Sequence, residues 1–407
     1  MKIGLGKLHL LIFILIYVLV FFLTGSLQFF LGVPYVLVSL IILFLLSFIV
    51  VIYLPKWNYR NWDKVVILGF IYAFLIILSG IINQSDIVHI ILYLIFPALP
   101  TLFYLFFKAG IKERTFYRRK ISLILMFTAC IQLPFILAQR LSYDFMKDFN
   151  RSGQALIEVD FWFGTFPFKA DHALGMFLLF NILNIYWYNK KLKLTKFPWL
   201  VMIWIGITIF LTDTKITQLM LAGLFIVHAY IAVPRNIKIL GIATVVIAAI
   251  TAIFFLQKIP ILKQEYEYAQ KAYTLEHSKA TYNSGIYARR INIVIYYLNF
   301  KPLTLIGDGP YDYFNFRKGE FKKTHHFSQL IWTYNDVGLL GLVTVVLFMY
   351  YIVKSLALTR WRKWLIFLIL MVYAFYTIAL FDFALIIALL TILNNKFLDE
   401  PDPDTIS

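Results

Sequence analysis

Long apolar segments recur along almost the whole of this 407-residue chain, and they constrain its fold more than any other feature. A helix needs about 20 mostly apolar residues to cross a hydrocarbon core about 30 Å thick. Charged residues make up only 14% of the chain, whereas about a quarter is usual in soluble domains. We therefore expect an all-α polytopic membrane protein in which residues 1–407 form a single membrane domain.

The hydropathy pattern predicts about twelve transmembrane helices. Segment 364–395 is interpreted as two helices hinged at Phe381–Asp382, because one helix of that length would overshoot a bilayer about 30 Å thick. The expected spans lie near 8–24, 33–54, 65–82, 87–107, 121–138, 172–188, 197–212, 216–233, 239–257, 338–353, 364–380 and 382–395.

The positions of Lys and Arg predict the orientation. With the N-terminus inside, 22 of the 38 Lys and Arg residues fall in cytoplasmic segments, and the four short outer connections carry only Lys215. The other 15 lie in two long outer loops, 139–171 and 258–337, which the positive-inside rule discounts because long loops translocate regardless of charge. We therefore expect both termini in the cytoplasm. The net charge of +17 follows from this topology, so a nucleic-acid partner is not needed to explain it.

Ionisable residues are scarce inside the expected spans and gather at their outer ends. An ion-coupled transporter needs ionisable groups at mid-membrane, and no Asp, Glu, Lys or Arg falls well inside any expected span. Asp171 and His172 precede the sixth span, and Asp213 and Lys215 stand between the seventh and eighth. This distribution favours a membrane enzyme with its site at the outer face, although a flippase with a polar groove remains an alternative.

The outer loop 258–337 is too long to be a simple connection, and loops of this length are usually functional. We expect two amphipathic helices in it, near 258–280 and 286–300, the second with Arg289 and Arg290 in its first turn. Its later elements are Pro302, a tight turn at Gly307-Asp308-Gly309-Pro310, the pair His325-His326, and an apolar helix that runs to Gly338–Gly341, where the tenth span starts.

The order of these elements resembles the O-antigen polymerase and O-antigen ligase superfamily, which are bacterial integral-membrane glycosyltransferases of the GT-C type. The similar elements, spread over roughly 165–345, are Arg289/Arg290, Pro302-Leu303, Gly307-Asp308-Gly309, His325/His326, Asp336 and Gly338–Gly341, with Thr212-Asp213-Thr214-Lys215 upstream. The last of these stands where the family has a Ser-Arg element. Lys215 offers a point charge in place of a planar fork, so its match is the weakest.

The resemblance implies a metal-independent, inverting transfer of glycan from undecaprenyl pyrophosphate to a sugar hydroxyl, at the outer face of the bacterial cytoplasmic membrane. Arg289, Arg290 and Lys215 would stabilise the pyrophosphate charge. His325 or His326 would be the catalytic base for the acceptor hydroxyl. No cofactor is expected, because no His, Asp and Glu set has metal-ligand spacing. Further candidate site residues are Asp171, Asp213, Asp308 and Asp336.

The same residues have plainer interpretations. The arginine pair could bind lipid headgroups, Lys215 could be an interfacial anchor, and Asp308 could only cap its turn.

Within the family, a polymerase joins repeat units and a ligase hands finished chains to lipid A core. Since no sequence feature is special to core recognition, we favour the polymerase, with a chain-length regulator and a flippase of the same pathway as possible partners. A non-catalytic flippase for lipid-linked oligosaccharides is the alternative from another class.

Overall fold

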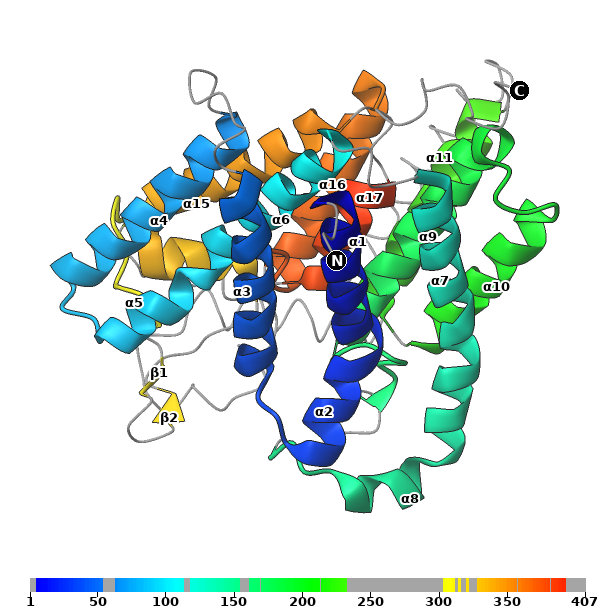
Figure 1. The fold of residues 1–407 in the computed structure, drawn as a ribbon, viewed down its shortest axis with the longest axis horizontal. Coiled ribbons are helices and arrows are strands. Elements are labelled where there is room, and N and C mark those ends of the chain that lie inside the picture. Colours follow the sequence, from blue (N-terminus) through cyan, green and yellow to red (C-terminus); the bar gives the residue numbers. More distant parts are fainter. Residues whose placement is uncertain are drawn as a thin grey trace, which may run out of the picture.

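The computed structural model describes residues 5–53, 63–112, 118–153, 161–168, 170–212, 214–232, 303–311, 314–315, 320–321, 328–356, 358–380 and 382–392. Apart from two short strands, β1 (Phe314–Asn315) and β2 (Glu320–Phe321), every regular element in these ranges is a helix (Figure 1). The two strands pair antiparallel with each other. The expected all-helical class is therefore confirmed.

The helices of the N-terminal part correspond to the expected spans, but the first of them runs on to Leu31, through the outer connection expected at 25–32. A continuous helix of α1 (Leu5–Val18), a π-helical turn (Leu19–Leu23) and α2 (Thr24–Leu31) opens the chain. It is followed by α3 (Tyr35–Tyr53), α4 (Lys64–Ile82), α5 (Ile87–Tyr93), α6 (Ile95–Lys112), α7 (Arg118–Leu141), the short α8 (Tyr143–Met146) and a 3₁₀ turn (Lys147–Phe149). The remaining helices are α9 (Asp171–Leu192), α10 (Pro198–Leu211), α11 (Lys215–Ala232), α15 (Gln329–Ser355), α16 (Arg360–Tyr376) and α17 (Phe383–Ile392).

Six of the described helices are long and apolar enough to cross a membrane. They are Leu5–Leu31, Tyr35–Tyr53, Lys64–Ile82, Ile87–Gly110, Arg119–Leu141 and Gln329–Ser355. Large apolar side chains such as Phe44, Phe74 and Leu200 are more than half exposed on their helices, as lipid-facing residues are. The chain is thus a multi-pass membrane protein. The full count of twelve stays a prediction, and the expected span 239–257 lies outside the described residues.

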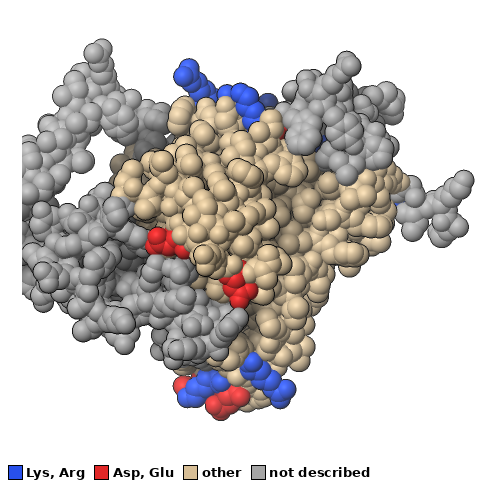
Figure 2. Space-filling view, turned by 90° about the vertical axis from the view of Figure 1, so that its left-hand side faces the viewer, with Lys and Arg blue, Asp and Glu red and all other residues tan. Residues whose placement is uncertain are grey.

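Basic side chains mark the ends of the bundle. On the face shown in Figure 2, the visible Lys and Arg residues gather at the top and at the bottom. The surface between them carries no visible Lys or Arg, although two acidic patches lie on it.

The C-terminal hinge separates two helices, as the sequence predicts, but the second of them is not a span in its described part. Every residue of α17 from Phe383 to Leu390 is buried, against α9, α7 and α6. Its 10 residues rise only about 15 Å, half of a hydrocarbon core about 30 Å thick. The described part of the expected span 382–395 is therefore a short helix that is buried from Phe383 to Leu390.

Segment 161–168, which belongs to the expected outer loop 139–171, folds back into the bundle. Its aromatic side chains Phe161, Trp162, Phe163, Phe166 and Phe168 are all buried. Non-helical backbone inside a membrane domain must find other hydrogen-bond partners, and three glutamines supply them. Gln132 accepts from the Thr165 N–H (2.9 Å), Gln139 accepts from the Gly164 N–H (2.9 Å), and Gln28 accepts from the Phe168 N–H (2.9 Å).

The long helix α15 is broken at Gly338. The residue has φ +79° and ψ −166°, far from helical values, while the helix continues on both sides. The sequence predicts a helix before this glycine and a span after it, and the structure has both. What the sequence does not show is that the two halves form one element with a backbone break between them.

Candidate functional site

The turn at Gly307–Gly309 lies directly on the break in α15. A broken helix leaves N–H and C=O groups without partners in the helix, and the loop 303–311 pairs with them. The four backbone bonds are Asp308 N–H to Asn335 O (2.8 Å), Gly309 N–H to Asp336 O (3.1 Å), Leu339 N–H to Thr304 O (3.0 Å) and Leu340 N–H to Leu305 O (3.2 Å). We call this arrangement of residues 303–311 and 335–340 the loop–helix junction.

The junction requires glycine on both sides. A Cβ on Gly307 would lie 2.4 Å from the Asn335 carbonyl oxygen, and a Cβ on Gly338 would lie 2.4 Å from the Leu305 carbonyl oxygen. Both distances are well below van der Waals contact, and the opposing atoms are backbone. Two of the elements that carry the family resemblance are therefore in direct contact.

Asp336 is at the centre of the junction and is fully buried. One carboxylate oxygen accepts from the Tyr311 N–H (3.1 Å), and the other accepts from the Asn335 side-chain amide (2.7 Å). Burial raises the pKa of the Tyr311 phenol and the nearby Asp336 charge raises it further, so Tyr311 stays protonated. This geometry makes Asp336 a positioning residue that fixes the turn, while Asp308 lies half-buried within it.

The turn between α4 and α5 covers the junction from the other side. The Asn83 side chain donates to the Gly307 carbonyl (2.8 Å), and the Ser79 hydroxyl donates to the Asp336 carbonyl (2.6 Å). The Tyr311 ring packs against Tyr93 at a centroid distance of 5.4 Å. Helices from both ends of the chain thus hold the loop in place.

A second group of candidate residues lies where the Thr212–Lys215 turn packs on α9. A Cβ on Gly175 would lie 2.6 Å from the hydroxyl oxygens of both Thr214 and Thr217, so the turn rests on the helix backbone. Gly175 is one helical turn beyond Asp171, which begins α9. The structure therefore packs the Thr212–Lys215 turn one helical turn from the start of α9, with Lys215 exposed at the start of α11.

Arg140 is a cation at this turn that sequence reasoning missed. Its guanidinium donates to the Leu211 carbonyl (2.6 Å) and lies 4.6 Å from the centre of the Trp162 ring. Its Nε is buried without a hydrogen-bond partner in the described part of the chain. The sequence did place an arginine at the outer end of the fifth span, but the positive-inside rule discounts it as part of a long loop.

Several expected site residues lie outside the described residues: Arg289, Arg290, His325, His326 and Asp213. The described chain resumes at Ser328, which is buried and whose hydroxyl caps α15 by accepting from the Ile331 N–H (3.3 Å). Within the described residues, no three His, Cys, Asp or Glu side chains gather as metal ligands.

Comparison of the chain with models of known protein families, with curated proteins and with solved structures gives no match. The resemblance therefore depends on the sequence elements themselves and on how they pack.

Replacing Arg140 with Gln is expected to destabilise the protein. The change removes a charged hydrogen bond to Leu211 and the stacking on Trp162, and a hydrogen bond to a charged group is worth about 1.5–3 kcal/mol. Arg119→Gln, at the exposed opposite end of α7, is the control and should change stability by no more than about 0.5 kcal/mol. Thermal unfolding in detergent measures both variants. Equal midpoints would mean that Arg140 does not hold the turn.

Proposed function

We propose that the protein polymerises undecaprenyl-pyrophosphate-linked oligosaccharide repeat units into a surface polysaccharide, such as O-antigen, capsule or exopolysaccharide, at the outer face of the bacterial cytoplasmic membrane. The observation that carries the proposal is the loop–helix junction. Gly307–Gly309 lies well before Asp336 and Gly338 in the sequence, and these residues are part of the order of elements that resembles the polymerase and ligase superfamily. In the structure they pack as one unit.

The junction also bears on the proposed catalytic base. The stretch between Tyr311 and Ser328 contains His325 and His326, and its two ends are both anchored. Tyr311 is bound to Asp336, and the Gln329 N–H beside Ser328 donates to the Thr377 carbonyl (3.0 Å). A catalytic group is best held between rigid elements, so this anchoring supports a site in this stretch.

The second group of residues supports the binding of an anionic donor. Lys215 is exposed at the first position of α11, where the helix dipole adds partial positive charge. Arg140 adds a further cation beside the same turn. In the proposed mechanism, Arg289, Arg290 and Lys215 bind the pyrophosphate, and Arg140 keeps the Lys215 turn in position.

The proposed reaction is a direct displacement. The acceptor sugar hydroxyl attacks the anomeric carbon of the donor while the bond from that carbon to the pyrophosphate oxygen breaks. The hydroxyl proton passes to His325 or His326, and the lipid pyrophosphate leaves with its charge stabilised by the cations. Attack opposite the leaving group inverts the anomeric centre.

The test is to incubate the purified full-length protein with defined lipid-linked repeat units in vesicles. A ladder of products is expected. Transfer to lipid A core without a ladder would identify a ligase, and movement of the lipid across the bilayer without a new glycosidic bond would identify a flippase.

Arg289→Ala combined with Arg290→Ala should remove most of the ladder, and Lys at both positions should restore only part of it, because the planar fork is lost. Arg119→Gln is the control.

A further inference from the structure

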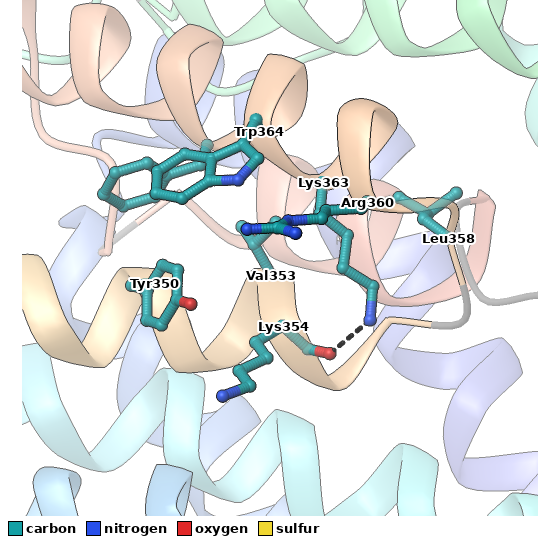
Figure 3. A pocket seen from close by; sticks show the side chains of 8 residues that line it. Tyr350, Val353, Lys354, Leu358, Arg360, Lys363 and Trp364 are labelled. Carbon is teal, nitrogen blue, oxygen red and sulfur yellow. Dashed lines mark hydrogen bonds between the residues drawn. The ribbon is translucent and has the colours of Figure 1, made fainter.

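A cavity of about 350 Å³ lies where α15 ends and α16 begins (Figure 3). Among the described residues that line it, three are cationic, Lys354, Arg360 and Lys363, and none is acidic. Its aromatic walls are Tyr350, Trp364 and Phe367. The candidate site residues at the loop–helix junction and around Lys215 are not part of this cavity.

The cations converge from two helices. The Lys363 ammonium donates to the Lys354 carbonyl (2.7 Å), which fixes the connection between α15 and α16. The Lys354 ammonium lies 5.8 Å from the centre of the Tyr350 ring. Figure 3 shows the Arg360 guanidinium reaching into the space between Trp364 and Lys354. Like charges this close repel one another, and an anion among them would reduce the repulsion.

The first turn of α16 adds to this repulsion. It contains Arg360, Arg362 and Lys363 and no acidic residue, and Thr359 provides no side-chain cap. A helix N-terminus carries partial positive charge and free N–H groups, so it favours anions and disfavours cations. A phosphate group beside this turn would offset the repulsion between the basic side chains and the positive end of the helix dipole.

The surroundings of the cavity indicate that the phosphate belongs to a lipid headgroup. Trp364 is 52% exposed, and the apolar residues that follow it towards the middle of the bundle are also exposed, Leu368 on α16 and Leu347 on α15. The cavity therefore stands where a basic end of the bundle meets a lipid-facing apolar surface. Phospholipid headgroups lie at this level, and basic pockets between transmembrane helices bind anionic ones.

We propose that this cavity binds the headgroup phosphate of an anionic phospholipid from the adjacent leaflet. Lys354, Arg360 and Lys363 hold the phosphate, the N–H groups of α16 face it, and the acyl chains lie along the exposed faces of α15 and α16. The site is independent of the proposed polymerase activity.

The experiment counts lipids bound to the purified full-length protein by native mass spectrometry, with phosphatidylglycerol or phosphatidylcholine added at equal concentrations. The test variant combines Lys354→Gln and Arg360→Gln, because Lys363 also holds the helix connection. The control combines Lys190→Gln and Lys191→Gln, which removes the same charge from exposed positions in the last turn of α9. That turn lies at the same end of the bundle, since Arg362 of α16 stacks on Trp187 (4.9 Å).

We expect the wild type and the control to retain one phosphatidylglycerol and the test variant to bind it at least tenfold more weakly. Phosphatidylcholine should bind weakly to all three. Equal binding of the two lipids by the wild type would overturn the proposal, as would undiminished binding by the test variant or an equal loss in the control. Displacement of the lipid by millimolar inorganic phosphate would show that the cavity takes the free anion, and would overturn the lipid assignment.

Discussion

Replacing Gly338 with Ala is expected to lower the free energy of unfolding by about 3 kcal/mol or more and to leave little folded protein. The backbone at φ +79° and ψ −166° is in a region that is essentially open only to glycine. A Cβ there would also lie 2.4 Å from the Leu305 carbonyl oxygen and 2.7 Å from the Gly307 nitrogen. Because both are backbone atoms, no flexible side chain can move aside. The yield of monodisperse protein and the midpoint of thermal unfolding in detergent measure the effect.

Gly223→Ala is the matched control, since a Cβ on this α11 residue meets no atom within 4 Å. Ala is favoured over Gly in a helix by about 1 kcal/mol, so this variant should unfold at the same temperature as the wild type or higher. If Gly338→Ala were as stable as the control, the break in α15 would not depend on glycine.

Removing the proposed catalytic base is expected to cost roughly 10²–10⁴ in the rate of polymerisation. Replacing one of His325 and His326 with Ala should have this effect, and replacing the other should lower the rate only mildly. The variant of the second histidine is therefore the matched control. Binding of the lipid-linked donor should change little, because a base acts on the acceptor hydroxyl. Single-turnover rates and donor affinity, measured on the same preparations, separate the two effects.

The pH dependence gives a second readout for the same residue. A base must be neutral, so the wild-type rate should fall as the pH drops through the pKa of the functional histidine. Lys322 and Lys323 precede the pair in the sequence, and neighbouring cations disfavour a charged imidazole. The pKa should therefore lie at or below that of an ordinary histidine. If both single variants and the double variant retained the wild-type rate and pH profile, neither histidine would be the base.

The helices were predictable because a membrane span leaves a strong local signal. The bounds of α4 and α9 differ from the expected 65–82 and 172–188 by at most a few residues, and the break before α17 falls at the expected hinge. Local hydropathy reports what a segment contains and not what covers it. This is why the buried position of α17 was missed, although its apolar composition was evident.

The aromatic segment 161–168 was missed for a related reason. Its Phe and Trp residues suit an interfacial belt as well as a protein core. The choice between the two depends on Gln28, Gln132 and Gln139, which stand on other helices and carry no recognisable spacing. Arg140 is similar, since its role depends on a carbonyl group 71 positions later.

The candidate site was predictable in its order and less so in its geometry. In the sequence, Gly307–Gly309 and Gly338–Gly341 are two separate elements of the same resemblance, and the structure joins the first of these to the start of the second. Asp336 was expected among the site residues, and both of its carboxylate oxygens accept hydrogen bonds within the junction. A single sequence gives the type and position of such a residue, whereas its hydrogen-bond partners depend on segments distant in the chain.

The loop–helix junction also sets an order for assembly in the membrane. Ser79 and Asp336, which share a hydrogen bond, are 257 positions apart, so α4 is synthesised and inserted long before its partner leaves the ribosome. Until then, the polar groups of Ser79 and Asn83 have to be satisfied by water or by a provisional neighbour. A late step of biogenesis is therefore the docking of α15 together with its preceding loop onto helices already in place, and α16 and α17 follow it. A chain that stops before Ser328 would insert α4 and still lack the contacts that close the bundle.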